Sequence, residues 1–560
     1  MILKYLKISI YELYATALIA FASGLRILLA ALGWPPTNAD EGTMGIMALH
    51  VAYRGERPLL FYGQNYMGSL EAYLGALFFH LLGPSLFALR LGVILLVTLF
   101  FVSTYLLASL LYSKKVALVT LALLGLGSIP VFTRQIIATG GSSQTLLFGS
   151  LAFLLAAWLS YTYVPRSAMR LKLLRLLGYA TWGLVIGLGL WSDMVVLPFF
   201  AMAGLLLLVF CWRELWWAWI ALLMGSIVGA VPIIYYNFKH GQNSVSTLLG
   251  LFHGTTSQAP HNLHGLLHGI MSTILVSIPT ATGSPFCPVI ELPWLGDNSP
   301  HTVQCTLAHA SWGLGYLALL GLALLLALRA LWLLRSQIQM GSAEKRQTLV
   351  RSIAHLMLLA SAVLAIAIYC VSSAPTDWPG FHARYLVGLL IITPAILAPL
   401  CNAAMPQRSA YPSVSILLSC GIFLLIGASF LAGTFVTFSE VARTQAANQR
   451  QADLIHHLVN IGATHIYTDY WTCNNLAFGS NERIICSVLD GNLQPSHNRV
   501  PRYNDIVSAD PHAAYVFPLG LTQLSAVQKR VHQAPGKYRS FSFDGYVVYQ
   551  KQGSRRWQRL

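Results

Sequence analysis

Apolar runs of twenty or so residues recur along this chain, and they constrain its fold more than any other feature. Examples are Ala15–Gly33, Leu86–Tyr112, Leu314–Leu334 and Val414–Thr437. Each run is long enough to cross a hydrocarbon layer of about 30 Å as a helix. Inside lipid every backbone polar group needs a partner within the chain, so helices are the expected form. Only 10% of the 560 residues are charged, against about 25% in soluble proteins. We therefore predict an all-α polytopic membrane protein with about eleven transmembrane helices.

The formal net charge of +16 comes largely from basic residues in short loops between the apolar runs. Examples are Lys114–Lys115, Arg166–Arg175 and Arg335–Arg351. Basic loops of this kind mark the cytoplasmic side of a membrane protein. We therefore expect a multi-pass plasma-membrane protein with a cytoplasmic N-terminus and an extracytoplasmic C-terminal segment. Nucleic-acid binding is excluded, because the sequence has no basic stripe with stacking aromatic residues outside the predicted spans.

The composition changes near residue 438. Residues 1–437 are expected to form the transmembrane domain, with the first apolar stretch retained as a span because Gly33-Trp34-Pro35-Pro36 is a poor signal-peptide cleavage site. Residues 438–560 carry most of the remaining charge, and short runs such as His465–Thr468 and Tyr546–Tyr549 are typical of strands. We predict that this segment is a small extracytoplasmic α/β domain.

Two cysteine pairs lie in segments that are predicted to face an oxidising compartment. Cys287 and Cys305 share the second long outer loop, about 237–308, and Cys473 and Cys486 share the C-terminal domain. Neither pair has the CxxC spacing of a zinc site. Because disulfides persist outside the cytoplasm, we predict that both pairs are oxidised.

Acidic residues are scarce before residue 438, which makes the adjacent pair Asp40–Glu41 informative. The pair directly follows the first span, at the start of the first long outer loop, about 34–85. Ionisable groups beside a membrane-embedded cavity are functional candidates, and a carboxylate there can act as a general base or bind a cation. The structural alternative is that Asp40 caps a helix over Gly42–Tyr53. The residues alone leave both interpretations open.

Three cationic residues stand beside predicted outer ends of spans, namely Arg134, Lys239 and Arg384, the last of them followed by Tyr385. An arginine in this place can bind a phosphate through two hydrogen bonds. It can also extend to lipid headgroups without any further role. Phosphate binding and headgroup contact therefore both stay open for each of the three.

Four histidines lie in the second outer loop: His253, His261, His264 and His268. The last three are spaced for one face of a helix, so a zinc or manganese site is one interpretation. Solvated or hydrogen-bonded histidines are the other interpretation. We assign no metal ligands from the sequence, and a divalent metal is the only cofactor that we consider.

Four passages share a pattern with a known group of enzymes. They are Asn38–Gly42 (NADEG), Tyr62–Tyr73 with Leu82–Leu91, Gly187–Asp193, and His382–Leu386. These passages resemble the GT-C glycosyltransferases of the protein-mannosyltransferase and aminoarabinose-transferase type, in particular the RgtA/B/C/D-like bacterial enzymes. The likeness is best over roughly the first 240 residues, and it implies a GT-C-like transmembrane domain.

The resemblance also implies a function. By it, the chain would move a sugar with inversion from a polyprenyl-phosphate carrier to a glycan, lipid or protein acceptor at the outer face of the membrane. Asp40 would be the catalytic carboxylate, with Glu41 beside it. Many relatives have a second acid in the loop after span three, but here Thr133–Thr145 holds Arg134 and no carboxylate. Either Asp193 or Glu41 substitutes for that acid, or a two-acid mechanism does not apply.

Two other functions stay open. One is transport or flipping of lipid-linked sugars, although transporters often show internal repeats and none is visible here. The other is a non-catalytic GT-C relative whose outer domain binds a partner. The long first outer loop with Asp40 favours the enzyme over both.

Overall fold

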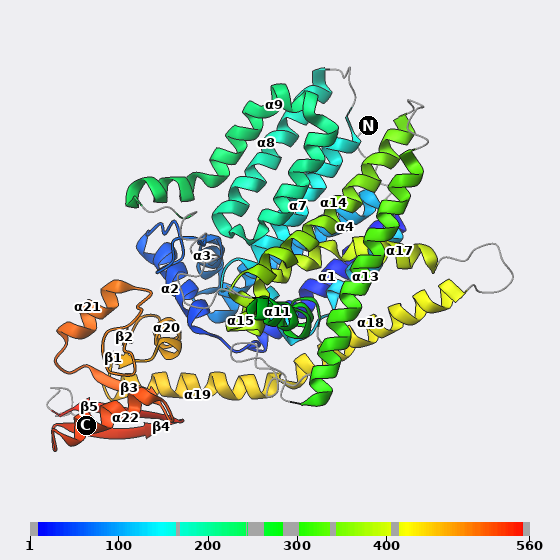
Figure 1. The fold of residues 1–560 in the computed structure, drawn as a ribbon. Helices are drawn as coiled ribbons and strands as arrows, with labels where there is room; N and C mark the ends of the chain where they lie inside the picture. The colour runs from blue at the N-terminus through cyan, green and yellow to red at the C-terminus, as the bar shows by residue number, and fades with distance from the viewer. Residues whose placement is uncertain are drawn as a thin grey trace.

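The structure is a computed structural model, and Figure 1 shows its course from the first helix to the C-terminal sheet. It describes residues 9–163, 169–241, 244, 263–283, 302–335, 343–404 and 414–552. Within this part of the chain the protein has a large helical body and a small C-terminal domain that contains a β-sheet (Figure 1).

Ten helical segments of the described residues are long and apolar enough to cross a membrane, and the number rises to eleven if the bent pair α5–α6 forms one span. The predicted number of about eleven is thereby confirmed. The helices of this body are α1 (Ile10–Ala31), α4 (Leu86–Leu111), α5 (Lys114–Gly125), α6 (Ile129–Ile136), α7 (Ser142–Tyr161), α8 (Met169–Ser192), η1 (Met194–Val196), α9 (Leu197–His240), α11 (Leu263–Ser272), η2 (Thr273–Ser277), α12 (Ile278–Thr282), α13 (Val303–Arg335), α14 (Ala343–Val371), α15 (Ala374–Asp377), α16 (Pro379–His382), η3 (Ala383–Ile392), α17 (Thr393–Ala403) and α18 (Val414–Ser439).

Helix α9 is 44 residues long, about twice what one crossing requires. The contacts of two glycines in α8 show that it does not run straight. A Cβ added to Gly189 would lie 2.3 Å from the ring of Phe200, and one added to Gly183 would lie 2.1 Å from the carbonyl oxygen of Leu222. A straight helix would separate Phe200 from Leu222 by about 33 Å, far more than the distance between the two glycines. The chain therefore reverses within α9.

The sharp bend between α5 and α6, 93°, has an identifiable cause. The last carbonyls of a helix have no partner within the helix. Here the buried side chain of Arg26 from α1 donates to Gly125 O at 2.9 Å and to Leu124 O at 3.0 Å. Its Nε also donates to Gln135 Oε1 on α6 at 2.9 Å. One arginine thus joins both arms of the bend, and α6 is turned to lie at the level of the outer loops.

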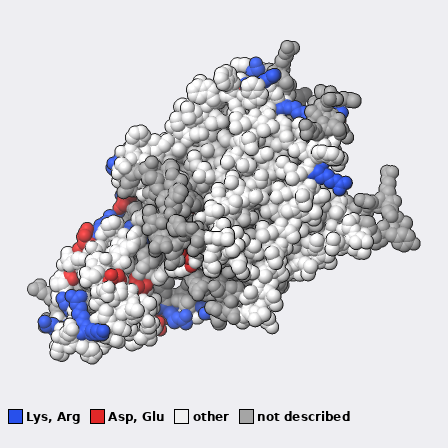
Figure 2. All heavy atoms as spheres, viewed as in Figure 1, with Lys and Arg blue, Asp and Glu red and all other residues white. Residues whose placement is uncertain are grey.

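Two helices form the segment that is predicted to be the first outer loop: α2 (Ala39–Arg54) and α3 (Leu70–Leu82). Helix α3 is apolar but too short to span a membrane. Figure 2 shows one face of the molecule, where the helical body carries few charged residues and acidic and basic side chains gather over the C-terminal domain. The charge distribution therefore follows the division into a membrane-embedded body and a solvated domain.

The C-terminal domain follows α19 (Val441–Asn460), which leads directly from α18. Its sheet has five strands in the order β2-β1-β3-β5-β4, with β1 parallel to β2 and β3, and β5 antiparallel to β3 and β4. The predicted α/β class of this segment is thereby confirmed. Its elements are β1 (His465–Thr468), α20 (Tyr470–Gly479), β2 (Ile485–Val488), α21 (Pro501–Ala509), β3 (Ala514–Pro518), α22 (Thr522–His532), β4 (Tyr538–Phe543) and β5 (Tyr546–Lys551).

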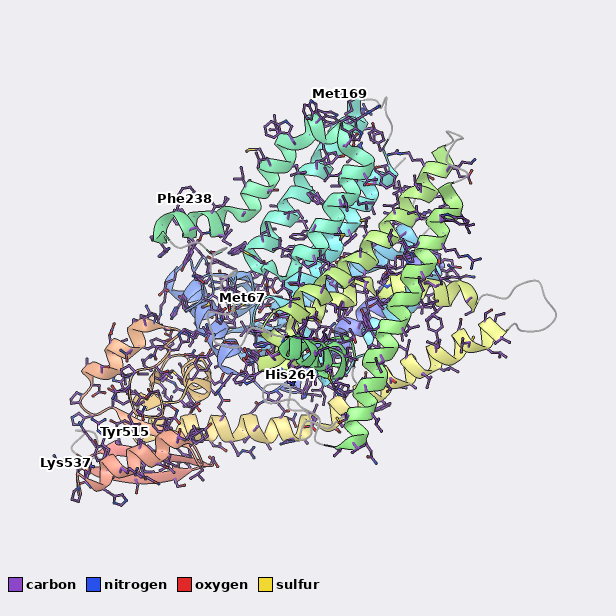
Figure 3. The ribbon with its side chains drawn as sticks, viewed as in Figure 1. Met67, Met169, Phe238, His264, Tyr515 and Lys537 are labelled. Atoms are coloured by element: carbon purple, nitrogen blue, oxygen red, sulfur yellow. A yellow bond between two sulfur atoms is a disulfide. The ribbon has the colours of Figure 1, made fainter. Side chains whose placement is uncertain are left out.

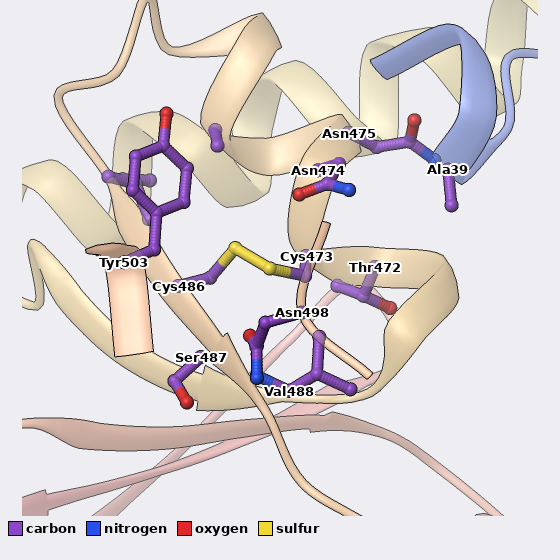
Figure 4. Close-up of a disulfide and its surroundings, with 12 residues drawn as sticks. Ala39, Thr472, Cys473, Asn474, Asn475, Cys486, Ser487, Val488, Asn498 and Tyr503 are labelled. Carbon is purple, nitrogen blue, oxygen red and sulfur yellow. A yellow bond between two sulfur atoms is a disulfide. The ribbon is translucent and has the colours of Figure 1, made fainter. Parts of the chain in front are cut away.

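One disulfide joins α20 to β2. Cys473 and Cys486 are bonded, with their Cα atoms 5.5 Å apart (Figure 4), which confirms this predicted pair. Cys287, half of the other predicted pair, lies outside the described residues. The disulfide fixes the helix of the C-terminal domain that contacts the first outer loop.

Helix α20 packs directly on α2, and two glycines permit this close approach. A Cβ added to Gly42 would lie 2.6 Å from the backbone of Asn474, and one added to Gly45 would lie 2.6 Å from the ring of Phe478. Asn474 Nδ2 donates to Thr43 Oγ1 at 2.7 Å. The C-terminal domain is therefore docked on the N-terminal half of α2, beside the residue pair that the sequence singled out.

Candidate active site

The first turn of α2 shows that its cap is not Asp40. Asn38 is the N-cap, and its Oδ1 accepts a hydrogen bond from the backbone N–H of Glu41 at 2.9 Å. The helix runs over Ala39–Arg54 rather than Gly42–Tyr53. The prediction that Asp40 caps this helix is therefore wrong, because the preceding asparagine satisfies the free backbone N–H first. Asp40 lies in the first turn of the helix and is not its cap.

Asp40 instead faces the C-terminal domain. Its Oδ1 accepts from Arg499 Nη2 at 2.9 Å and from the Tyr470 hydroxyl at 3.1 Å. Arg499 Nε also donates to the Tyr470 oxygen at 2.9 Å. Among the described residues none donates to Oδ2. Asp40 is 8% exposed, so its second oxygen is the one with which a ligand could form a hydrogen bond.

Glu41 lies in a different environment. Its side chain is fully buried, and Arg90 binds it through Nε to Oε1 at 2.9 Å and through Nη2 to Oε2 at 2.8 Å. The backbone N–H of Ala138 also donates to Oε1 at 3.2 Å. This buried pair ties α2 to α4 and to the loop after α6. Glu41 therefore holds the scaffold, and its lack of exposure keeps it from a substrate.

Arg384 and Arg134 line one small cavity between α6, α12 and η3. Arg384 Nε is buried and has no hydrogen-bond partner among the described residues, while Nη2 donates to the Tyr385 hydroxyl at 3.3 Å. Arg134 Nη2 donates to Phe381 O at 3.0 Å. Both guanidinium groups are near enough to Asp40 for their charges to interact with it. The structure thus brings three predicted site residues and Tyr385 together.

An apolar cavity of about 550 Å³ adjoins this cluster. It lies between α5, α12, α13, η3 with α17, and α18, and its walls include Trp312, Tyr316 and Phe430. Leu390 lines both this apolar cavity and the small arginine-lined cavity. Thr282, which lines the apolar cavity, directly follows Ala281, which lines the small one. The apolar cavity and the arginine-lined cavity are therefore neighbours that share Leu390 as a wall.

Asp193 is near this cluster and Lys239 is not in contact with it. Asp193 lies between α8 and η1, where its Oδ1 accepts from the N–H of Val195 at 3.0 Å. Burial raises the pKa of this carboxyl, and the charge of Arg384 opposes the rise. Lys239 lies exposed in the last turn of α9, next to Phe238 in Figure 3, and no contact with Asp40 or Arg384 is found within the described residues.

A carboxylate reaches the loop after α6 from another helix. Glu71 of α3 accepts from the N–H of Gly140 at 2.8 Å and from Ser143 Oγ at 2.9 Å. Burial raises the pKa of Glu71 to about 7. The loop after α6, which contains no acidic residue, is thus held by Glu71 of α3. The sequence did not reveal this contact because the two segments are about seventy residues apart.

Two further aromatic and basic groups of the cluster escaped sequence analysis. Burial raises the pKa of Tyr66 to about 12, and its neighbours include Tyr385, Arg384 and Arg499. Arg499 itself looks in the sequence like one of many basic residues of a solvated domain. Only the docking of that domain on α2 makes it part of the site.

Among the described residues no group of three or more His, Cys, Asp or Glu side chains has an arrangement that could hold a metal ion. His264 and His268 are exposed on α11, and Figure 3 labels the first of them. His253 and His261 lie outside the described residues. The histidines that the structure describes therefore do not form a set of ligands for the zinc or manganese site that the sequence left open.

Comparison with known proteins identifies the fold. No protein-family model and no curated protein matches the sequence. The solved structure of ArnT from Cupriavidus metallidurans bound to undecaprenyl phosphate is similar, with 12% identity and a TM-score of 0.53 over 96% of this chain and 97% of that chain. The apo ArnT structure (12% identity, TM-score 0.49, 92% and 93% covered) and the apo oligosaccharyltransferase of Archaeoglobus fulgidus (13%, 0.46, 99% and 75%) also match. The likeness to undecaprenyl-phosphate-bound ArnT shows that this chain has the GT-C fold expected from its sequence.

Proposed function

We propose that this protein is an inverting glycosyltransferase that moves a sugar from a polyprenyl-phosphate carrier to an acceptor at the outer face of the membrane. One observation carries the proposal: a carboxylate with an unoccupied oxygen lies near two arginines, and an apolar cavity of about 550 Å³ adjoins the small cavity that these arginines line. The ArnT structure of the same fold holds undecaprenyl phosphate, a lipid of this class. The comparison and the cluster thus support the same kind of donor.

The cavities suit the two ends of such a donor. The apolar cavity has room for part of a polyprenyl chain, whose burial removes hydrocarbon from contact with polar groups. The phosphate would lie at Arg384 and Arg134, because a guanidinium binds phosphate through parallel hydrogen bonds. Arg384 Nε, which has no partner among the described residues, supplies a donor already directed into this region. The sugar would then extend from the phosphate toward Asp40.

The reaction uses the carboxylate and the arginines in opposite roles. Asp40 Oδ2 accepts the proton of an acceptor hydroxyl as the hydroxyl oxygen attacks the anomeric carbon of the sugar. The bond between that carbon and the phosphate oxygen breaks from the opposite side, and its electron pair stays on the polyprenyl phosphate. The arginines stabilise the negative charge that develops there. Attack opposite to the leaving group inverts the configuration of the anomeric carbon.

We also propose the orientation and the partners that follow. The start of α8 at Met169 and the C-terminal domain lie at opposite ends of the molecule (Figure 3), and the basic loops predict that the Met169 end is cytoplasmic. The site would then face outward, where a lipid carrier is the source of activated sugar. The acceptor would be a glycan, a lipid or a protein. A chelator added to the assay tests whether a divalent metal, the one cofactor considered from the sequence, takes part in the transfer.

The experiment is a transfer assay with purified protein in lipid nanodiscs and a panel of labelled polyprenyl-phosphate sugars. Asp40→Asn keeps the shape of the side chain and removes the base, so turnover should fall by about 10²–10⁴ while donor binding is kept. Asp377 is an exposed acid and the last residue of α15, and Asp377→Asn is the matched control that should keep full turnover. A folded Asp40→Asn protein with full transferase activity would falsify the base assignment.

The arginine is tested in the same assay. Arg384→Ala should weaken donor binding and lower turnover, and Arg384→Lys should restore part of both because it returns the charge without the forked geometry. Arg443 is an exposed arginine of α19, and Arg443→Ala should change neither. If the wild-type protein moves lipid-linked sugar across the bilayer and forms no glycosidic bond with any donor, it is a transporter and the proposal fails.

A further inference from the structure

The arginine that binds Asp40 is itself held firmly. Its guanidinium lies over the ring of Phe61 at 5.0 Å and near the ring of Tyr470 at 5.6 Å. With the amide of Gln64 oriented to satisfy both groups, Gln64 Oε1 accepts from Arg499 Nη1 at 3.0 Å. Arg499 is 8% exposed. A side chain with this many partners has little freedom to move, so it can fix the position of the carboxylate that it binds.

The geometry at Asp40 is one-sided. Arg499 and Tyr470 both bind Oδ1, and the hydrogen bond between them closes a ring of three side chains. This arrangement stops the carboxylate from rotating about its χ angles and leaves Oδ2 on the other side.

We propose that Arg499 is a positioning residue for Asp40, so that the C-terminal domain is a working part of the catalytic centre. The proposal rests on the proposed function, in which Asp40 is the base. Arg499 acts through Asp40 and does not touch the reacting atoms. Its removal should therefore lower the rate of the chemical step more than it weakens the binding of the donor.

The rival explanation is that the pair only helps to attach the domain. Several contacts already do so without Asp40. The backbone of Asn474 packs on Gly42, its side chain binds Thr43, and His50 Nε2 lies 2.9 Å from Glu482 Oε1. Because these contacts hold α20 and the following turn against α2, the docking of the domain does not depend on the Asp40 ion pair.

The chain offers a matched control for this distinction. Arg502 follows Arg499 by three residues and also reaches the first outer loop, where its Nη1 donates to Glu56 Oε1 at 3.3 Å. It is about half-exposed and does not contact Asp40. Arg502→Met thus removes an arginine from the same interface and leaves the carboxylate in place.

The experiment measures kcat and the KM for donor of Arg499→Met, Arg499→Lys, Arg502→Met, Asp40→Asn and the Asp40→Asn/Arg499→Met double variant. Thermal unfolding of each purified protein confirms that it is folded. A misplaced catalytic group typically costs about 10² in rate, so Arg499→Met should lose about that much in kcat with a small change in KM. Arg499→Lys should regain about half of this loss on a logarithmic scale, because a lysine restores the charge without the fork. Arg502→Met should keep the wild-type kcat.

The double variant separates positioning from attachment. If Arg499 acts only through the Asp40 carboxylate, Arg499→Met should cost nothing further in the Asp40→Asn background. Two results would overturn the positioning role and leave the proposed function standing. One is that the rate losses of the two single variants multiply in the double variant. The other is that Arg499→Met has the wild-type kcat while Asp40→Asn is inactive. Full activity in Asp40→Asn would overturn both.

Discussion

Gly42→Ala should weaken the docking of the C-terminal domain on α2, although it adds only one methyl group. The added Cβ would lie 2.6 Å from the carbonyl carbon of Asn474, where ordinary contact begins at 3.4 Å. The obstacle is backbone, which no rotamer change can move, so α20 would have to withdraw by about 0.8 Å. Overpacking of this kind costs about 1–3 kcal/mol. Loss of the Asn474–Thr43 hydrogen bond adds about 1 kcal/mol, so the docked state should be weakened by roughly 2–4 kcal/mol.

The shift should be visible in two assays. Hydrogen exchange should become faster for the backbone amides of α20, and sugar transfer should fall by up to about 10² because Arg499 moves with the domain. Gly24 of α1 is the control, since nothing lies within 4 Å of a Cβ added there. Gly24→Ala should leave both assays unchanged. Wild-type exchange and wild-type transfer in Gly42→Ala would refute the close packing on which this reasoning depends.

Three further predictions follow from particular contacts. Glu41→Gln removes the partner of a fully buried arginine, so it should destabilise the protein by about 3–5 kcal/mol, and an unchanged thermal midpoint would contradict this. Burial raises the pKa of Glu482, but the hydrogen bond from His50 and other contacts hold it below the usual 4.5. Its contribution to docking is therefore complete above that pH and is lost as the pH falls below it, which limited proteolysis of α20 over a pH series will show. Reduction of Cys473–Cys486, which closes a short loop, should cost the domain about 3 kcal/mol in a thermal melt.

The parts of the fold that depend on local pattern were predictable. Long apolar runs specify spans by themselves. The strand β1 has the predicted bounds, His465–Thr468, because the residue pattern of a strand is local. The sharp bend between α5 and α6 was not predicted. It depends on Arg26, a residue of α1 about a hundred positions away that binds the carbonyls at the bend, and no local rule describes such a partner.

The candidate site divides in the same way. Asp40 could be singled out because acids are scarce in the apolar part of the chain, and Arg384 because it lies at the end of a span. The separate roles of Asp40 and Glu41 could not be predicted from their neighbouring positions in the sequence. Asp40 faces Tyr470 of α20, whereas Glu41 faces Arg90. Arg499 lies 459 residues from the carboxylate that it binds, and its surroundings in sequence are those of an ordinary surface residue.

That separation has a consequence for biogenesis. Ribosomes make chains from the N-terminus, so Asp40 is synthesised and inserted well before Arg499, which follows it by 459 residues. On the proposed function, an unfinished chain in the membrane contains the lipid cavity and the base but lacks the group that orients the base. Activity would then rise by about 10² when the C-terminal domain has crossed the membrane and docked, and a product terminated before Arg499 would keep only the low rate.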